Sequence, residues 1–341
     1  MKILFIGGSG VISRAATQQT LAAGHDLWLL NRGQHRAIAG AKTLVADTAD
    51  PEGMRTALRG HDWDVVVQWI AYAPADIRRD IGLFRASARQ YIFISSATVY
   101  EKPPQHYVVT ESTARGNPFW EYARLKIACE RELETAHQSS GFPGVIVRPS
   151  LTYGEDQVPL ALNSWQQSWT AIDRMRRGVP VIIPGDGTSL WTITHNTDFA
   201  QGLLGLFGNR ATLGEAFHIT SDEVLTWNQI FLQAAQAAGV AAPNFVHIAS
   251  DFIVACAPAV AGSLLGDKAV SAVFDNGKIK RYVPGFAAQT RFADGIRKTI
   301  AWFDADPIRQ QVDAATNERW DRLASAYGAA LTQAKAALEA S

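Results

Sequence analysis

The stretch that decides the fold reads KILFIGGSGVIS and spans residues 2–13. It starts with a short, mostly apolar run of the kind found in strands that are buried on both faces. The run breaks into glycines at positions 7, 8 and 10, and a helical stretch begins near Val11. Glycine at position 10 lets a phosphate group approach the first helical amides and the positive end of the helix dipole. Such a strand, turn and helix predict a dinucleotide-binding unit.

This turn supplies the first set of expected cofactor contacts. The residues that we expect to contact a bound dinucleotide here are Gly7, Ser9, Gly10, Val11 and Ile12. Ser13 stands where the G-x-x-G-x-x-G pattern has its third glycine. A serine there costs packing space between helix and strand but leaves the phosphate cradle intact. The alternative is a plain turn that needs glycine only for its backbone.

The end of the second expected strand, 26–30, indicates which dinucleotide binds. An acidic residue at this point accepts hydrogen bonds from the ribose of NAD, whereas an arginine accommodates the 2′-phosphate of NADP. This strand runs into Asn31 and Arg32, with Arg36 nearby and no carboxylate. The residues therefore favour NADP over NAD. The alternative is that Arg32 is a solvated loop residue and that NAD binds through Asn31.

Asp47 follows the third expected strand, 43–46. It is placed to accept a hydrogen bond from the adenine amino group of the cofactor. It is placed equally well to cap the helix that follows Pro51. Both roles remain open at the level of sequence.

The first half of the chain alternates strand-like runs with helical stretches, which is typical of a parallel sheet covered on both faces. Expected strands are 2–6, 26–30, 43–46, 65–68, 91–95 and 144–147, and expected helices begin near residues 11, 51, 75 and 118. The pattern predicts an α/β fold, a doubly wound Rossmann-type sheet with a smaller, mostly C-terminal substrate-binding domain. We expect 1–150 and about 190–210 to form the cofactor domain, and 151–189 and 211–304 to form the substrate-binding part. Residues 305–341 are expected to be a helical extension.

The composition excludes several classes of protein. The 341 residues contain 32 Lys plus Arg and 32 Asp plus Glu, so no overall charge attracts nucleic acid or an anionic membrane. Two cysteines do not make a disulfide framework, and no Cys/His/Asp spacing suggests a metal site. The apolar run at the N-terminus is too short for a signal peptide, and no run is long enough to span a bilayer. We therefore expect a cytoplasmic protein with a small-molecule substrate and neither a nucleic-acid nor a membrane partner.

Tyr122 and Lys126 stand four residues apart in the helical stretch that follows Pro118. This spacing places both side chains on one face of a helix. A phenol with a pKa near 10 is a poor acid or base at neutral pH, but an adjacent ammonium stabilises the phenolate. Ser96 follows the fifth expected strand, at the sheet edge where such folds bind ligands. The alternatives are a solvated helix face and a serine that merely ends a strand.

Together these residues resemble the extended short-chain dehydrogenase/reductase superfamily, the NAD-dependent epimerase/dehydratase family. The likeness covers about residues 1–304, and its motifs are the glycine turn, Ser96 with Val99-Tyr100, Tyr122 with Lys126, Arg148-Pro149 with Tyr153-Gly154, 185–188, 195–200, 274–278 and 283–286. The resemblance implies that Ser96 orients the substrate, that Tyr122 is the acid/base, and that Lys126 lowers the phenol pKa and binds ribose. We also expect Ala71 and Pro149 to contact the cofactor.

The chain departs from the pattern of the family in ways that concern the substrate. Members that bind sugar nucleotides usually carry an arginine after the Gly-Asp-Gly segment, and 188–192 contain no cation. Dehydratases place Asp-Glu after the catalytic serine position, where this chain has Ala97-Thr98. We expect Thr98, Asn163 and Trp191 to contact the substrate. His195 is expected to be structural, and Asp198 to cap a helix. A homodimer is a possible partner state, and the short segment 71–90 suggests an altered form of the family's usual dimer interface.

These expectations define a leading function and two alternatives. The leading one is an NAD(P)-dependent oxidoreductase that moves hydride between nicotinamide and a secondary alcohol or ketone of a sugar-like small molecule. Within the enzymes, the alternative is a redox-neutral sugar or nucleotide-sugar epimerase with tightly bound NAD. From another class, the alternative is a non-catalytic relative that senses cofactor or binds RNA.

Overall fold

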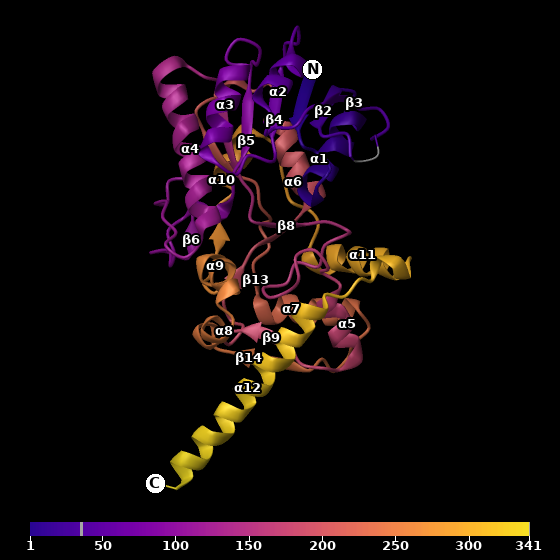
Figure 1. Cartoon of the computed structure of the whole chain (residues 1–341), viewed down its shortest axis with the longest axis vertical. Coiled ribbons are helices and arrows are strands. Elements are labelled where there is room, and N and C mark those ends of the chain that lie inside the picture. The colour runs from indigo at the N-terminus through magenta and orange to yellow at the C-terminus, as the bar shows by residue number, and fades with distance from the viewer. Residues whose placement is uncertain (35–36, 341) are drawn as a thin grey trace. The chain divides into compact units, whose positions relative to one another are not determined.

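A computed structural model describes residues 1–34 and 37–340, so Arg36 lies outside the described residues. Within these residues the chain divides into two compact units, which are described separately (Figure 1). Unit 1 comprises Met1–Thr152, Thr194–Asp222 and Phe274–Gln289. Unit 2 comprises Tyr153–Ile193, Glu223–Val273 and Thr290–Ser341.

Unit 1 is built on a sheet that has seven parallel strands in the described part of the chain. The spatial order is β12-β7-β5-β4-β1-β2-β3. The bounds are β1 Lys2–Ile6, β2 Asp26–Asn31, β3 Lys42–Val45, β4 Val65–Gln68, β5 Tyr91–Ile94, β7 Gly144–Arg148 and β12 Ala216–His218. The direction of winding reverses between β1 and β4, the switch point at which such sheets bind ligands beyond their carboxyl ends. The expected doubly wound Rossmann-type fold is confirmed.

Helices cover both faces of this sheet because its central strands are apolar on both sides. One apolar core lies between the sheet and the helices α1 (Val11–Ala22) and α6 (Asn196–Gly205), and α10 (Gly277–Tyr282) contributes Ile279 to it. The other core lies under α2 (Pro51–Leu58), α3 (Pro74–Phe84) and α4 (Glu121–Ser140). Residues 3 and 5 of β1 face the first core and residues 4 and 6 the second, as strand alternation requires.

Unit 2 contains short strand pairs and several helices. β9 (Val181–Pro184) pairs in parallel with β14 (Phe245–Ile248), and β10 (Leu190–Trp191) pairs antiparallel with β13 (Leu225–Thr226). Its helices are α5 Thr170–Arg177, α7 Trp227–Ala237, α8 Ser250–Cys256, α9 Ala261–Ser263, α11 Phe292–Asp304 and α12 Ala314–Glu339. The remaining short strands of the chain are β6 Val108–Val109, β8 Leu151–Tyr153, β11 Ile193–His195 and β15 Val273–Phe274.

The last helix of unit 2, α12, is buried only near its start. Trp320 and Leu323 are buried, whereas residues 328–340 are exposed. No helix in the residues that the structure describes is long and apolar enough to cross a membrane.

Some segments lie in a different unit from the one that the sequence predicts. Residues 211–222 belong to unit 1, because β12 extends the central sheet by pairing with β7. Residues 274–289 also belong to unit 1, where Ile279 and Phe286 enter its core. Residues 190–193 belong to unit 2, where β10 pairs with β13.

The glycine turn supplies a test of this fold. Gly8 has a φ of +108°, and a Cβ on it would lie 3.0 Å from Leu29 Cδ2. Gly60 has a φ of +76°, and a Cβ there would meet no described atom within 4 Å. We expect Gly60→Ala to lower the free energy of unfolding by about 1 kcal/mol through backbone strain alone. Gly8→Ala should cost roughly 1–3 kcal/mol more because it also overpacks the turn. Urea unfolding of both variants measures the difference, and equal losses would contradict the packing argument.

Candidate active site

The glycine turn after β1 fits a dinucleotide phosphate. Gly7 has a φ of +97°, and a Cβ there would lie 3.1 Å from Ile70 Cγ2, so the protein itself requires glycine at this position. Gly10 is different: it is exposed, and a Cβ would meet only Ser13 Oγ, at 3.6 Å. No described neighbour requires glycine there, which leaves the start of α1 open to a ligand. The first amides of α1, at Val11 and Ile12, have no acceptor within the helix and can donate to phosphate oxygens.

Ser13 and Asn196 fix the start of α1. The backbone amide of Gly10 donates to Ser13 Oγ at 2.9 Å, so the serine in place of a third glycine caps the turn. Asn196 Nδ2 donates to the carbonyl of Val11 at 2.9 Å and joins the starts of α6 and α1. Neither bond uses the amides of Val11 and Ile12.

The end of β2 presents hydrogen-bond donors. Asn31 Oδ1 accepts from the amide of Gly33 at 2.8 Å, which leaves its amide nitrogen to donate elsewhere. Arg32 is exposed. Residues 29–34, all of which the structure describes, include no carboxylate. These residues can donate hydrogen bonds to the ribose end of a bound dinucleotide.

Asp47 is exposed beyond β3, and its Oδ1 accepts from the amide of Ala49 at 2.9 Å. The cap of α2 is Asp50, whose side chain accepts from Glu52 and Gly53. The expected alternative role of Asp47 as the helix cap is therefore wrong, because Asp50 directly precedes the first helical residue. Contact with adenine remains a prediction.

Lys126 is buried at the centre of the site, with 2% of its surface exposed. Its Nζ donates to the carbonyl of Ala71 at 2.8 Å and to the carbonyl of Ile94 at 2.9 Å. The ammonium thus joins the loop after β4 to the end of β5, and its third N–H is available to a ribose hydroxyl. Burial lowers the pKa of Lys126 to about 8, although the nearby charges of Cys129 and Glu130 act in the opposite direction.

Tyr122 lies one helical turn before Lys126, half-buried among aromatic rings. Its ring centroid is 5.0 Å from that of Trp120 and 6.3 Å from that of Tyr72. Lys126 Nζ lies 5.8 Å from the centroid of the Tyr122 ring and 4.9 Å from that of Tyr72. The expected pair therefore shares one face of α4. Tyr72 reaches this helix only through the fold, which brings the loop after β4 beside it, whereas Trp120 stands two residues before Tyr122 in the sequence.

Ser96 begins the short turn Ala97–Val99 at the end of β5, with 9% of its surface exposed. Its Oγ accepts from the amide of Thr98 at 3.2 Å and from Thr98 Oγ1 at 3.0 Å. The amide of Ala97 donates to the carbonyl of Pro149 at 2.9 Å, so Pro149 supports this turn. The Thr98 hydroxyl is committed to Ser96 in the structure.

Asn117 attaches this turn to the start of α4. Its Nδ2 donates to the carbonyl of Thr98 at 2.9 Å, and its Oδ1 accepts from the amides of Phe119 and Trp120, both at 3.2 Å. The turn that carries Ser96 and the helix that carries Tyr122 are thereby held together. The two bonds of Asn117 Oδ1 are local and fit an asparagine before a proline at a helix start, but its bond to Thr98 is set by the tertiary fold.

The other expected substrate residues lie in unit 2 and are occupied by their own surroundings. Asn163 Nδ2 donates to the carbonyls of Val158 and Ser168, at 3.3 and 2.7 Å. Trp191 is 2% exposed and stacks on Trp227 with ring centroids 5.2 Å apart. Both residues thus have clear structural roles within unit 2, and contact with substrate remains a prediction.

His195, and not Asp198, caps the start of α6. The helix begins at Asn196, and its cap is His195, whose side chain accepts from the amide of Thr197. Asp198 lies within the first turn, so the expectation that it caps the helix is wrong. The structural role expected of His195 agrees with this capping bond.

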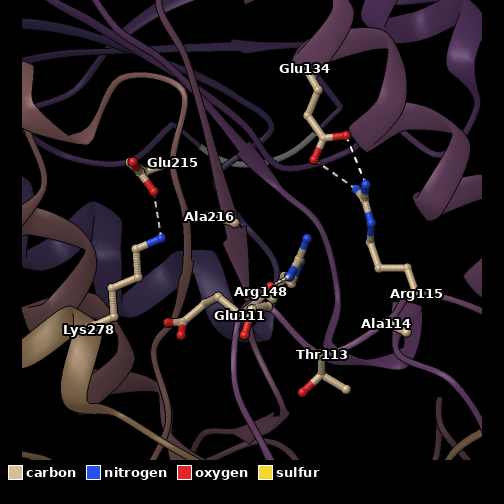
Figure 2. A pocket seen from close by; sticks show the side chains of 10 residues that line it. Glu111, Thr113, Ala114, Arg115, Glu134, Arg148, Glu215, Ala216 and Lys278 are labelled. Carbon is tan, nitrogen blue, oxygen red and sulfur yellow. Dashed lines mark hydrogen bonds and ion pairs between the residues drawn. The ribbon is translucent and has the colours of Figure 1, made fainter.

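A pocket of about 480 Å³ lies in unit 1, beside the end of β7 and the start of β12 (Figure 2). Its lining is charged, and Figure 2 shows Arg115 facing Glu134 and Lys278 facing Glu215. None of Ser96, Tyr122 and Lys126 lines it. This pocket is therefore separate from the catalytic groups that the sequence predicts.

The pKa of Lys126 makes a prediction about stability. The pKa is about 8 in the folded protein, against an ordinary value of 10.5. Between these values the unfolded chain binds more protons than the folded one, so the free energy of unfolding rises with pH. We compare the free energies of unfolding of wild type and Lys126→Met. Their difference should be constant below about pH 8. As pH approaches 10.5 it should shift in favour of wild type, by at most roughly 3 kcal/mol. Urea unfolding across this range measures it, with the exposed Lys298→Met as the control. A pH-independent difference would contradict the burial argument.

Comparison with known proteins adds to this geometry. Residues 3–219 match the model of a family described as the NAD dependent epimerase/dehydratase family. The chloroplast stem-loop binding protein of 41 kDa b from Arabidopsis thaliana is 27% identical over 72% of this chain, a match that spans only 65% of that protein's length. The 2′-dehydrokanamycin reductase from Streptomyces kanamyceticus is 24% identical over 70% of this chain and 67% of its own.

A solved structure shares the fold. The UDP-glucose 4-epimerase of Thermus thermophilus, in complex with NAD, superposes with a TM-score of 0.69 over 89% of this chain and 99% of its own, at 21% identity. The family match covers more than half of the residues and reaches every strand of the central sheet. The chain therefore belongs to the NAD-dependent epimerase/dehydratase family.

Proposed function

We propose that this protein is an NAD(P)-dependent oxidoreductase that interconverts a secondary alcohol and a ketone on a sugar-like small molecule. Ser96 orients the reacting oxygen, Tyr122 gives or takes its proton, and Lys126 supports Tyr122 and binds the cofactor ribose. The observation that carries the proposal is the buried ammonium of Lys126, which has two carbonyl partners and lies beside the ring of Tyr122. Among the described residues no carboxylate pairs with this ammonium. A buried cation held in this way is costly, and it is typical of a functional site.

The residues of the chain divide the chemistry among them. When bound, the reduced dinucleotide supplies the hydride that the substrate carbon receives. The Ser96 hydroxyl holds the carbonyl oxygen, and the Tyr122 phenol donates its proton to that oxygen as the alcohol forms. The Lys126 ammonium stabilises the phenolate that remains, which is then protonated from solvent. In the oxidative direction the same groups act in reverse.

The rings beside Tyr122 support a sugar-like substrate. Tyr72 is 52% exposed, and Trp120 packs against the ring of Tyr122. Such rings offer apolar faces on which the C–H face of a saturated ring can lie, next to a proton donor. Ala97-Thr98 supplies no carboxylate after Ser96, which argues against dehydration. The similarity to a reductase that is named for 2′-dehydrokanamycin also favours reduction of a ketone.

Two other functions have specific support. The solved relative named as an epimerase favours a redox-neutral reaction in which NAD stays bound. The similarity to a chloroplast stem-loop binding protein favours RNA binding. The equal numbers of acidic and basic residues argue against RNA binding, as does the retention of Ser96, Tyr122 and Lys126.

Cofactor choice tests the role of Arg32. We propose that its guanidinium binds the 2′-phosphate of NADP, so Arg32→Ala should weaken NADP binding by roughly tenfold and leave NAD binding unchanged. Titration of each dinucleotide against the fluorescence of the protein measures both dissociation constants. Arg59→Ala is the control. Arg59 is exposed in the segment between α2 and β4, which leads to the amino end of β4, whereas Arg32 follows the carboxyl end of β2. Equal affinities for NAD and NADP in the wild type would reject the preference.

Stoichiometry and Tyr122 together test the reaction. With a panel of keto-sugars and sugar nucleotides, a reductase consumes one equivalent of reduced cofactor for each product, and an epimerase consumes none. Tyr122→Phe should lower turnover by about 10²- to 10⁴-fold, since it removes the proton donor. Tyr107→Phe, at a tyrosine that is 54% exposed, should leave turnover intact. Full turnover in Tyr122→Phe would overturn the assignment, and tight binding of stem-loop RNA without turnover would favour the RNA-binding alternative.

A further inference from the structure

Glu130 continues the stripe of polar residues on α4 that begins with Tyr122 and Lys126. The three residues are spaced four apart and share one face of the helix. Glu130 is fully buried, with 0% of its surface exposed. It is not part of the proton chemistry proposed above, so its burial needs another explanation.

In the described part of the chain, the Glu130 carboxylate accepts four hydrogen bonds. Oε1 accepts from Ser95 Oγ at 2.6 Å and from Arg148 Nε at 2.9 Å. Oε2 accepts from Arg148 and from Arg115, both at 2.8 Å. Four bonds use about the full acceptor capacity of a carboxylate, and two guanidinium groups balance its charge.

The donors come from the segments that carry the proposed catalytic groups. Ser95 precedes Ser96 at the end of β5, and Arg148 precedes Pro149 at the end of β7. Glu130 itself lies on α4, two turns beyond Tyr122. The Glu130 carboxylate therefore connects three segments: the end of β5 next to Ser96, the helix α4 that carries Tyr122, and the end of β7, which leads to Pro149.

We infer that Glu130 is a positioning residue of this site: its carboxylate fixes α4 against the ends of β5 and β7 and so sets the Tyr122 phenol relative to the Ser96 hydroxyl. The inference rests on the proposed function, because it concerns the geometry of that reaction. Loss of such alignment by about 1 Å can lower a rate a hundredfold without loss of binding.

The network around Arg148 makes this attachment rigid. Arg148 also donates to Tyr100 Oη at 2.8 Å, and that hydroxyl bonds His218 Nε2. Burial, followed by the charge of Arg148, lowers the pKa of His218 to about 3, so the imidazole is neutral and accepts this bond. Burial acts to lower the pKa of Arg148, but the bonds and charge of Glu130 raise it above its ordinary value. The Arg148 guanidinium therefore stays charged while it holds Glu130.

Glu130 also acts on Lys126 through its charge. Lys126 faces Tyr122, Cys129 and Glu130 on its own helix, Asp76 on α3 and Tyr72 in the loop after β4. The charges of Cys129, Glu130 and Asp76 each favour the ammonium form and oppose the effect of burial on the pKa of Lys126. An uncharged residue at position 130 should therefore let Lys126 lose its proton at lower pH.

Glu134 supplies a matched control on the same helix. It holds Arg115 through two bonds of 2.9 Å, at the rim of the pocket in Figure 2. It has no bond to Ser95 or Arg148 among the described contacts. Glu134→Gln therefore removes a carboxylate from the same network and leaves the attachment at Glu130 in place.

The experiment compares Glu130→Gln, Ser95→Ala and Glu134→Gln with a substrate identified from the keto-sugar panel. We expect Glu130→Gln to lower kcat by about 10- to 100-fold while the KM and the NADPH dissociation constant change less than about threefold. In a plot of kcat against pH, the alkaline limb for Glu130→Gln should move to lower pH. Glu130→Asp keeps the charge, so it should return the limb to its wild-type position without restoring the full kcat. Ser95→Ala should lower kcat about tenfold with the limb unmoved. Glu134→Gln should match wild type in both measurements.

Several results would overturn the inference. If folded Glu130→Gln keeps the wild-type kcat and pH profile, or if Glu134→Gln is impaired equally, Glu130 has no special positioning role. Should Glu130→Gln fail to fold, Ser95→Ala decides, because it removes one hydrogen bond and no charge; wild-type kcat in that variant would reject the inference.

The failure of this inference is distinguishable from the failure of the proposed function. If Tyr122→Phe retains turnover, the proposed function fails whatever Glu130 does. If Tyr122→Phe is inactive and both Glu130→Gln and Ser95→Ala are fully active, only the inference about Glu130 fails. Amide hydrogen exchange gives a readout without substrate: Ser95→Ala should speed exchange of the Ala97 amide, which bonds Pro149, and Glu134→Gln should not.

Discussion

The buried ammonium of Lys126 is the interaction on which the arrangement of the site depends. A cation removed from water is unfavourable unless polar partners replace the water, and here the partners are the carbonyls of Ala71 and Ile94. Those carbonyls belong to the two segments that leave the sheet at its carboxyl edge, beyond β4 and β5. The ammonium of Lys126 therefore has both carbonyl partners only when both segments lie against α4. The same requirement places Tyr122, one turn earlier, over the edge at which parallel sheets bind ligands.

The charges beyond Lys126 are arranged so that this helix has one stable position. Glu130 is surrounded by the donors of Ser95, Arg115 and Arg148, and the loss of both arginines would leave its buried charge unpaired. A buried network of this kind contributes little to stability compared with an apolar core. It does penalise every arrangement in which the partners are misaligned. The bonds of Lys126 and Glu130 thus join the segments next to Ser96 to the helix of Tyr122, whereas the apolar cores on the two sheet faces bring these elements near one another.

The sequence predicted the central sheet well because its strands are apolar runs separated by strong turn signals. Every expected strand up to β7 is present within one or two residues, and the helix after the glycine turn begins at Val11 as expected. The Tyr122 and Lys126 pair was predictable for a similar reason, since a spacing of four on a helix fixes their relative position. Interactions between distant segments left no such signal. The partners of Glu130 lie 15 to 35 residues away in the chain, and Tyr72 meets Tyr122 only in the folded sheet.

The helix caps and Trp191 show that residue type alone does not predict a role that depends on position in the folded chain. Asp47 and Asp198 are good capping residues by type, yet Asp50 and His195 hold those places because each directly precedes the first helical residue. Trp191 has the large ring that suits a sugar, but it stacks on Trp227 and is buried in unit 2. The aromatic surface beside the proposed proton donor comes instead from Tyr72 and Trp120. In the reaction that we propose, the substrate would therefore meet rings that flank Tyr122, beside the helix and the loop that the bonds of Lys126 join.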